Sequence, residues 1–333
     1  MNNQLTRERY IQIIEEIRNR INNARYTCMC PQCNEKAINS HVFQRKRIIK
    51  QITTNGKVYA FILDDFFNLL YGRNPIKYEH KGAQESFSFY GFCQKHDNDL
   101  FLPIENDDVD WTDVRCQYLL GYKTICREIR IKQQAFTYLD EVSKTFVWEN
   151  ELEYIPILIS KQKKDIERTL PTLEQYKRLF EQGIFKTDYS KYKFKLIALP
   201  FCLDLCLASP ITIAEENRYA FIPKTQIVDT VNIVNIFPYN NQTFILLGFL
   251  DGMPNTWCSD IYNALQSNDR KVVANTLQDI MFRSDFNCIS EKLYNNIKDK
   301  LPLFYEEWRE LGTNFNKELS YNSDLFSEYI KGI

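Results

Sequence analysis

The sequence predicts a mixed α+β protein in which a cysteine-rich N-terminal module is followed by a larger region of strands and then helices. Segments rich in Ile, Val, Phe and Thr occur at residues 192–199, 227–237 and 243–250, as is typical of strands. Helical periodicity returns after Thr256 and continues to the C-terminus. Because strands and helices do not alternate regularly, we expect a mixed α+β domain ending in helices and not a doubly wound parallel sheet.

Length and charge limit the class of protein. A chain of 333 residues exceeds the size at which one core usually keeps growing, so we expect two domains, residues 1–147 and 148–333. A formal net charge of -1 excludes attraction of nucleic acid by the whole molecule, so such binding requires a local basic patch. The N-terminus has no signal-peptide pattern, and the longest apolar run, residues 244–250, is too short to cross a bilayer. We therefore expect a soluble, cytoplasmic protein with no membrane partner.

The metal-binding potential of the chain is concentrated in its first hundred residues. The sequence has ten cysteines and three histidines, and two of the histidines stand close to cysteines. Without a secretory signal, clustered cysteines favour a metal site over disulfides. Two short pairs of soft ligands are typical of tetrahedral Zn²⁺, and the candidates are Cys28, Cys30, Cys33, Cys93 and His96.

Two ligand sets are compatible with this spacing. In the first, Cys33 pairs with either Cys28 or Cys30, and Cys93 and His96 supply the other two ligands. In the second, all four cysteines bind zinc and His96 is free to bind a neighbouring ion.

The N-terminal half is predicted to contain short elements around these ligands. We expect an amphipathic helix over residues 6–24, and Asn55-Gly56 is a strong turn signal. The remaining expected elements are a strand at 37–41, a turn or two of helix at 44–52, a strand at 57–63, an irregular insertion at 64–84, a strand at 86–92, a helix opening at Asp97 as its N-cap, and a long helix from Thr112 to about residue 143.

The order of these residues resembles the plan of the HNH endonucleases, the ββα-metal or His-Me finger family, over residues 26–105. In that family a cysteine pair, a histidine ending a short strand, and a second ligand pair opening a helix form a treble-clef-like module. The resemblance implies that His41 is a general base and that Asp97, directly after the last zinc ligand, holds a catalytic Mg²⁺ or Mn²⁺. The residue before the base is usually Asp and is here Ser40.

The chemistry implied by this resemblance suits hydrolysis of a phosphodiester bond. A neutral imidazole can take a proton from water near neutral pH, and a hard divalent ion stabilises charge on the phosphate. Ser40 is a weaker ligand for such an ion than a carboxylate, so it either completes the shell, orients His41 or contacts phosphate. Four basic residues could bind nucleic acid or could simply form a solvated helix face: Arg45, Lys46, Arg47 and Lys50.

These observations lead to three functional expectations. The first is a metal-dependent endonuclease (a hydrolase) that cleaves DNA in preference to RNA, with a role in genome defence, such as antiviral defence, or restriction. The second is a non-catalytic zinc module that binds nucleic acid or protein. The third is a toxin-like effector regulated by a protein partner of the C-terminal domain. Outside the module, we expect His80 to be a surface residue and Cys202 and Cys206 to be core residues.

Overall fold

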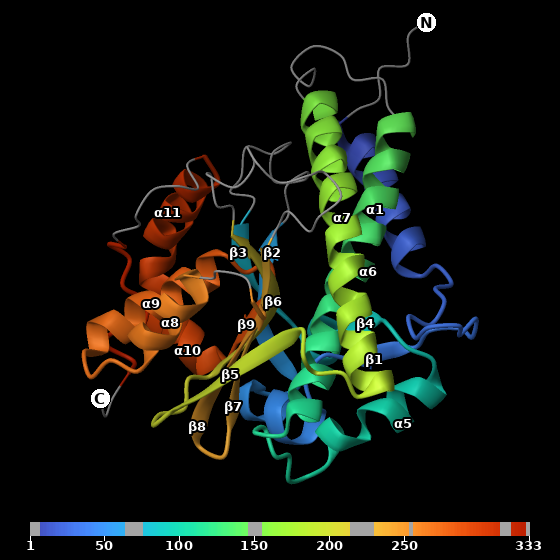
Figure 1. Ribbon diagram of the computed structural model, residues 1–333. Helices are drawn as coiled ribbons and strands as arrows, with labels where there is room; N and C mark the ends of the chain where they lie inside the picture. The colour runs from blue at the N-terminus through green and yellow to red at the C-terminus, as the bar shows by residue number, and fades with distance from the viewer. Residues whose placement is uncertain are drawn as a thin grey trace, which may run out of the picture.

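A seven-stranded antiparallel sheet passes through the middle of the molecule (Figure 1). The computed structural model describes residues 7–63, 76–145, 155–213, 230–252, 256–313 and 321–330. Its strand order is β3-β2-β9-β6-β7-β8-β5. The strands are β2 (Lys57–Leu63), β3 (Ile76–Gly82), β5 (Tyr192–Leu199), β6 (Leu205–Ile213), β7 (Thr230–Tyr239), β8 (Gln242–Leu250) and β9 (Asn287–Ile289).

The turns that connect neighbouring strands follow from local sequence. Asn240 and Asn241 join β7 to β8 with φ angles of 50° and 61°, as a two-residue hairpin turn requires. Asn55 and Gly56 turn the chain into β2 with φ angles of 51° and 76°, which agrees with the predicted turn. Asn and Gly tolerate this left-handed conformation better than other residues do.

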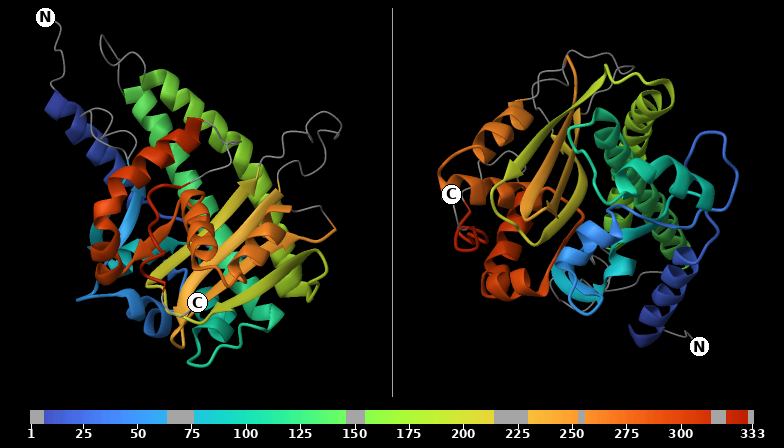
Figure 2. Two further views of the ribbon diagram at one scale, coloured as in Figure 1. Left: turned by 90° about the vertical axis from the view of Figure 1, so that its left-hand side faces the viewer. Right: turned by 90° about the horizontal axis from the view of Figure 1, so that it is seen from below.

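The two faces of the sheet are covered by different parts of the chain. Strand β7 is buried at every position, and its alternate residues belong to different cores. Ile233 and Phe237 pack with the N-terminal module, α6 (Val114–Thr145) and α7 (Ile155–Lys186). Val234 and Ile236 pack on the other face with α8 (Thr256–Leu265), α9 (Arg270–Phe282), α10 (Glu291–Ile297) and α11 (Leu301–Thr313). Figure 2 shows the molecule from the side on which α8–α11 cover the sheet, and from below.

A third apolar cluster joins three helices beyond the sheet (Figure 1). Helix α1 (Arg7–Asn22) buries Ile14, Ile17 and Ile21 against the ends of α6 and α7. Leu139 and Val142 come from α6. The amphipathic helix expected near the N-terminus is therefore present and packs as expected. Among the described residues, no helix combines the length and apolar character needed to cross a membrane.

The mixed α+β class is confirmed, and several local expectations need correction. The insertion predicted to be irregular, 64–84, contains β3 and the start of α4 (Ala83–Phe87), while residues 64–75 lie outside the described part. The strand expected at 86–92 is shorter, β4 (Ser88–Tyr90). Helix α5 (Gln94–Glu105) begins before Asp97, and its N-cap is Cys93. Strands β6 and β9 and helix α7 were not predicted, whereas the long helix α6 was.

The expected division of the chain at residue 147 does not coincide with a division of the sheet. Strands β2 and β3 come from the first half, yet β2 pairs with β9, which comes from near residue 288. Tyr59 lies opposite Ile289 in this pairing. The first domain therefore contributes a hairpin to the sheet of the second, so the two halves share one β-structure.

The close packing of α6 against α7 generates a stability prediction for Gly183. A Cβ atom there would collide with the ring of Tyr118, which is fully buried and donates a hydrogen bond to the Tyr192 carbonyl at 2.7 Å. Overpacking costs about 1–3 kcal/mol, more than the roughly 0.5–1 kcal/mol that Ala gains over Gly in a helix. We expect Gly183→Ala to lower the melting temperature measured by differential scanning fluorimetry.

The matched control is Gly82→Ala, because nothing lies within 4 Å of a Cβ at Gly82. This variant should melt like the parent protein. Equal melting temperatures for Gly183→Ala and the parent would contradict the α6–α7 packing.

Candidate metal centre

A small two-stranded sheet and the helix after it bring the two ligand pairs together. Strand β1 (Asn39–His41) pairs antiparallel with β4, so that Ser40 lies opposite Phe89. Beside this pair, the Met29 N–H donates to the Gly91 carbonyl at 2.8 Å, and the Ile38 N–H donates to the Phe92 carbonyl at 2.7 Å. The loop that carries the first cysteines is thus bonded to the segment that leads directly into α5.

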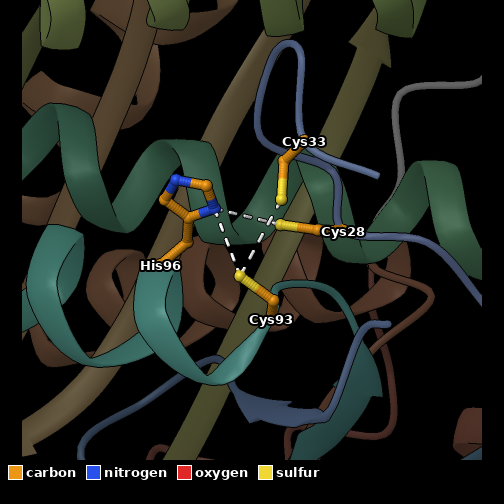
Figure 3. Close-up of side chains that lie close together, drawn as sticks. All are labelled: Cys28, Cys33, Cys93 and His96. Atoms are coloured by element: carbon orange, nitrogen blue, oxygen red, sulfur yellow. Dashed lines mark hydrogen bonds between the residues drawn. The ribbon is translucent and has the colours of Figure 1, made fainter. Parts of the chain in front are cut away.

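The first cysteines lie in a tight loop. The Cys28 N–H donates to the Glu35 carbonyl at 2.9 Å, and Thr27 forms a β-bridge with Lys36. Inside the loop, Gln32 has a φ of 59°, and the Cys33 N–H donates to the Cys30 carbonyl at 3.3 Å. This turn directs Cys28 and Cys33 toward the N-terminus of α5 (Figure 3).

Four side chains meet at this point: Cys28, Cys33, Cys93 and His96 (Figure 3). His96 Nδ1 lies 3.4 Å from Cys28 Sγ and 3.3 Å from Cys93 Sγ, and the Cys33 and Cys93 sulfurs are 3.9 Å apart. A tetrahedral zinc with bonds of about 2.3 Å to sulfur and 2.0 Å to nitrogen separates two sulfurs by about 3.8 Å and a sulfur from a nitrogen by about 3.5 Å. The group could therefore hold a metal ion such as zinc.

The cysteines differ in their tendency to ionise. Burial raises the pKa of the Cys28 thiol to about 11. Burial also acts on Cys93, but the backbone N–H groups of His96 and Lys95 and the thiols of Cys28 and Cys33 outweigh it, so the pKa of Cys93 is lowered. Cys93 is the N-cap of α5, where the helix dipole favours an anion. A metal ion would favour the thiolate of every cysteine that it binds.

Cys30 lies outside this group, although it was a candidate ligand. Its side chain is buried, and burial and the nearby cysteines raise its pKa far above the ordinary range for a thiol. His96 lies with Cys28, Cys33 and Cys93. The structure therefore brings together the first of the two predicted ligand sets, with Cys28 and not Cys30 as the partner of Cys33. Cys30 is one of the apolar core residues under α6.

His41 stands at the end of β1 with one ring nitrogen unsatisfied. Its Nε2 atom is buried and has no hydrogen-bond partner. Burial, followed by the positive charges of Arg45 and Lys123, lowers the pKa of His41 to about 4. The ring is therefore neutral over most of the physiological pH range and carries a free nitrogen.

Asp97 lies in the first turn of α5, where its N–H donates to the Cys93 carbonyl at 2.9 Å. Asp97, Phe101 and Glu105 follow one another at intervals of four and so share one side of the helix. Lys123 of α6 lies over the Phe101 ring, with its Nζ 4.4 Å from the ring centroid. The same Nζ donates to Glu105 Oε1 at 2.7 Å. Asp97 Oδ1 is buried without a hydrogen-bond partner. His41 and Asp97 thus each present an unsatisfied buried atom.

Ser40 is held by the backbone. Its side chain is fully buried, and its Oγ accepts a hydrogen bond from the Phe92 N–H at 3.2 Å. This bond ties β1 to the residue before Cys93. In this arrangement the hydroxyl fixes the strand that carries His41.

The candidate nucleic-acid-binding residues follow His41 on η1 (Arg45–Ile49) and α2 (Lys50–Ile52). Arg45, Lys46 and Lys50 are exposed. Arg47 Nε lies 3.8 Å from Asp107 Oδ1, and Arg47 Nη2 lies 3.7 Å from Asp108 Oδ1. The acidic loop after α5 therefore partly offsets the charge of Arg47. The three exposed cations therefore remain as the basic patch.

Helix α6 supports both halves of the module through polar side chains that reach the backbone of the module. Arg130 donates from Nε to the Tyr90 carbonyl and from Nη2 to the Thr27 carbonyl, both at 2.8 Å. Tyr122 donates to the Met29 carbonyl at 3.3 Å. Lys123 is 1 % exposed despite its charge. Sequence reasoning missed the role of Lys123, and the available signal was a charged residue within the apolar stretch of α6 between Cys116 and Ile129.

Comparison with known proteins does not assign this chain to a family. The chain matches no protein-family model, and it has no match among curated proteins or solved structures. The chemical interpretation of the site therefore rests on its own residues.

The metal centre generates a prediction about composition. The purified protein should contain about one zinc ion per chain by inductively coupled plasma mass spectrometry, as expected for one closed four-ligand site. Cys93→Ser should lose most of this zinc, since it removes a ligand at the N-terminus of α5.

Cys30→Ser is the matched control, because it changes a buried cysteine of the same loop that lies outside the group. It should retain the zinc. Loss of zinc from Cys30→Ser together with its retention in Cys93→Ser would contradict the ligand set.

Proposed function

We propose that the N-terminal module is a zinc-stabilised HNH-like nuclease of the ββα-metal, treble-clef-like type. In chain order it consists of strand β1 ending at His41, strand β4, and helix α5 with Cys93 and His96 at its start. The zinc ion would stabilise the module, and a separate Mg²⁺ or Mn²⁺ near Asp97 would serve catalysis.

One observation carries the proposal: the unsatisfied Nε2 of His41 on β1 and the unsatisfied Oδ1 of Asp97 on α5. Buried polar atoms nearly always have hydrogen-bond partners, so these two exceptions, beside which the module also has Gln44 Oε1, need a reason. One is a neutral nitrogen base and the other a hard oxygen ligand. Water and a divalent cation are the partners that these two atoms would take.

The proposed reaction is hydrolysis of a phosphodiester bond. His41 takes a proton from the attacking water through its free nitrogen, and the burial that keeps the ring neutral leaves it able to do so. The divalent ion, held by Asp97, would stabilise negative charge on the phosphate and the leaving oxygen. Arg45 is close enough to His41 to affect its pKa and is exposed, so it can contact the phosphate.

DNA is the proposed substrate on the strength of the resemblance to HNH endonucleases. A role in genome defence or restriction extends the same reasoning. The exposed cations Arg45, Lys46 and Lys50 supply the local charge that a chain of net charge -1 needs to bind a polyanion.

A non-catalytic zinc module is the second candidate, and the position of Ser40 favours it. In HNH enzymes the residue before the base is usually an Asp that binds the catalytic ion. Ser40 has a single hydroxyl, which is buried and already bonded to the Phe92 N–H. In this alternative, the basic patch would bind nucleic acid without cleaving it.

Substitution of His41 separates the two functions. We expect zinc-loaded protein with added Mg²⁺ or Mn²⁺ to nick or cleave plasmid DNA, and His41→Ala to lose at least about 100-fold of this activity, the lower range for loss of a general base. Agarose-gel conversion of supercoiled plasmid measures the rate, and circular dichroism checks folding.

His80→Ala is the control histidine substitution, because His80 is exposed on β3 and stacks on Tyr59 away from the module. It should cleave like the parent. If His41→Ala and His80→Ala cleave equally fast, His41 is not the base and only the binding function remains.

The lowered pKa of His41 predicts the pH dependence of cleavage. A base with a pKa of about 4 stays neutral as the pH falls from 7 to 5 and is lost only as the pH falls through 4. An unperturbed histidine, with a pKa near 6.5, would be only about 3 % neutral at pH 5. We therefore expect kcat/KM on a short DNA duplex to remain nearly constant between pH 7 and about pH 5. An acid limb centred near 6.5, in samples whose zinc content is unchanged, would contradict this assignment.

A further inference from the structure

A cavity of about 390 Å³ lies among the C-terminal elements, and nothing in the nuclease proposal uses it. It is bounded by the β5–β6 connection, by α10 with the 3₁₀ turn η3 (Lys298–Lys300), and by the C-terminal segment 321–330. Its apolar neighbours Phe201 and Leu325 belong to the core on the α8–α11 side of the sheet. Cys28 and Cys93 of the metal centre belong to the core on the opposite side, and Cys33 packs against it.

One wall of the cavity is cationic. Lys292, Asn296 and Lys300 line it at intervals of four residues, so they share one side of α10 and its continuation. The Lys292 side chain is 74 % exposed, and its Nζ lies 3.6 Å from Asp204 Oδ2. Lys300 donates to the Asp324 carbonyl at 2.8 Å, which holds its ammonium group at the cavity. Its Nζ also lies 3.7 Å from Oε1 of Glu328, an 84 % exposed carboxylate that lines the same cavity and that a bound phosphate would displace from this loose pair. Two ammonium groups therefore flank an amide.

The aromatic part of the cavity lining consists of Tyr329 and Phe201, and it is fixed in place. It adjoins the cationic wall, because Lys292 Nζ lies 5.4 Å from the centroid of the Tyr329 ring. The Tyr329 hydroxyl donates to Asp204 Oδ2 at 2.6 Å, and the Ser290 hydroxyl contacts the same oxygen at 3.3 Å. The Ser290 N–H also donates to the Asp204 carbonyl at 3.0 Å. Because Asp204 fixes the tyrosine ring before any ligand arrives, little conformational entropy is lost on binding.

We propose that this cavity binds a nucleoside monophosphate. The volume is within the range of small-molecule sites and too small for a folded polymer segment. A planar base can lie against the ring of Tyr329, a phosphate can lie between Lys292 and Lys300, and Asn296 can pair with a polar edge of the base or sugar. This proposal is independent of the nuclease proposal, because it involves other residues on the other side of the sheet.

The cavity contains its own reporter, the thiol of Cys202. The cysteine was expected to be a core residue, but it is only partly buried and lines the cavity. Among the ten cysteines, only Cys202 and Cys33 are partly exposed, and Cys33 belongs to the metal centre. Burial and the neighbouring Asp204 carboxylate raise the pKa of Cys202, so its alkylation is slow enough to follow. A ligand in the cavity would shield this thiol.

The test measures alkylation of Cys202 by iodoacetamide in the full-length, zinc-loaded protein, with peptide mass spectrometry as the readout. The probes are AMP, GMP, CMP and UMP, with adenosine and inorganic phosphate for comparison. We expect at least one nucleotide to slow alkylation severalfold at millimolar concentration and to do so better than adenosine or phosphate. In Lys292→Gln the concentration giving half-protection should rise about tenfold, as for loss of a charge-assisted hydrogen bond.

Lys298→Gln is the matched control, because Lys298 is exposed in the same segment but does not line the cavity. It should be protected like the parent protein. Absence of protection by all four nucleotides, protection by phosphate equal to that by every nucleotide, or unchanged protection in Lys292→Gln would each overturn the proposal.

Discussion

The arrangement of the N-terminal half depends on the convergence of two ligand pairs that are about sixty residues apart. Cys28 and Cys33 come from a tight loop before β1, and Cys93 and His96 come from the start of α5. Between them the chain leaves the module, forms the β2–β3 hairpin of the large sheet, and returns through α4 and β4. An ion bound at this point closes a loop that includes part of the central sheet. Metal binding would therefore stabilise the junction of module and sheet as well as the module itself.

Helix α6 provides the second connection and explains why the module need not be a self-sufficient unit. Arg130 and Tyr122 bond to backbone carbonyls of β4 and of the loop before β1. Lys123 pairs with Glu105 of α5 and lowers the pKa of His41 through its charge. Because α6 also packs on β6 and β7, the candidate base rests on a rigid scaffold. A site supported in this way holds its side chains in place at little entropic cost when substrate binds.

Sequence reasoning found the residues whose significance is local and missed those whose significance is tertiary. The ligand spacing, the turn at Asn55-Gly56 and the strands with strong β-formers are visible in short windows. The choice between Cys28 and Cys30 depends on the loop geometry at Gln32, which a spacing rule does not contain. Strand β9 has three residues and forms only because β2 and β6 flank it, and Lys123 acquires its surroundings only when α6 meets α5. The pairing of β2 with β9 is likewise tertiary, because it joins strands from the two sides of the expected division at residue 147.

The central claim is that one ion is held by three sulfurs and one imidazole nitrogen at the start of α5. X-ray absorption spectroscopy at the zinc K-edge of the purified protein tests it directly. The predicted spectrum has three sulfur scatterers at about 2.3 Å and one nitrogen at about 2.0 Å, with the outer-shell features of a single histidine ring. A fit requiring four sulfurs and no imidazole would contradict the claim, because it would place Cys30 on the ion and remove His96 from it.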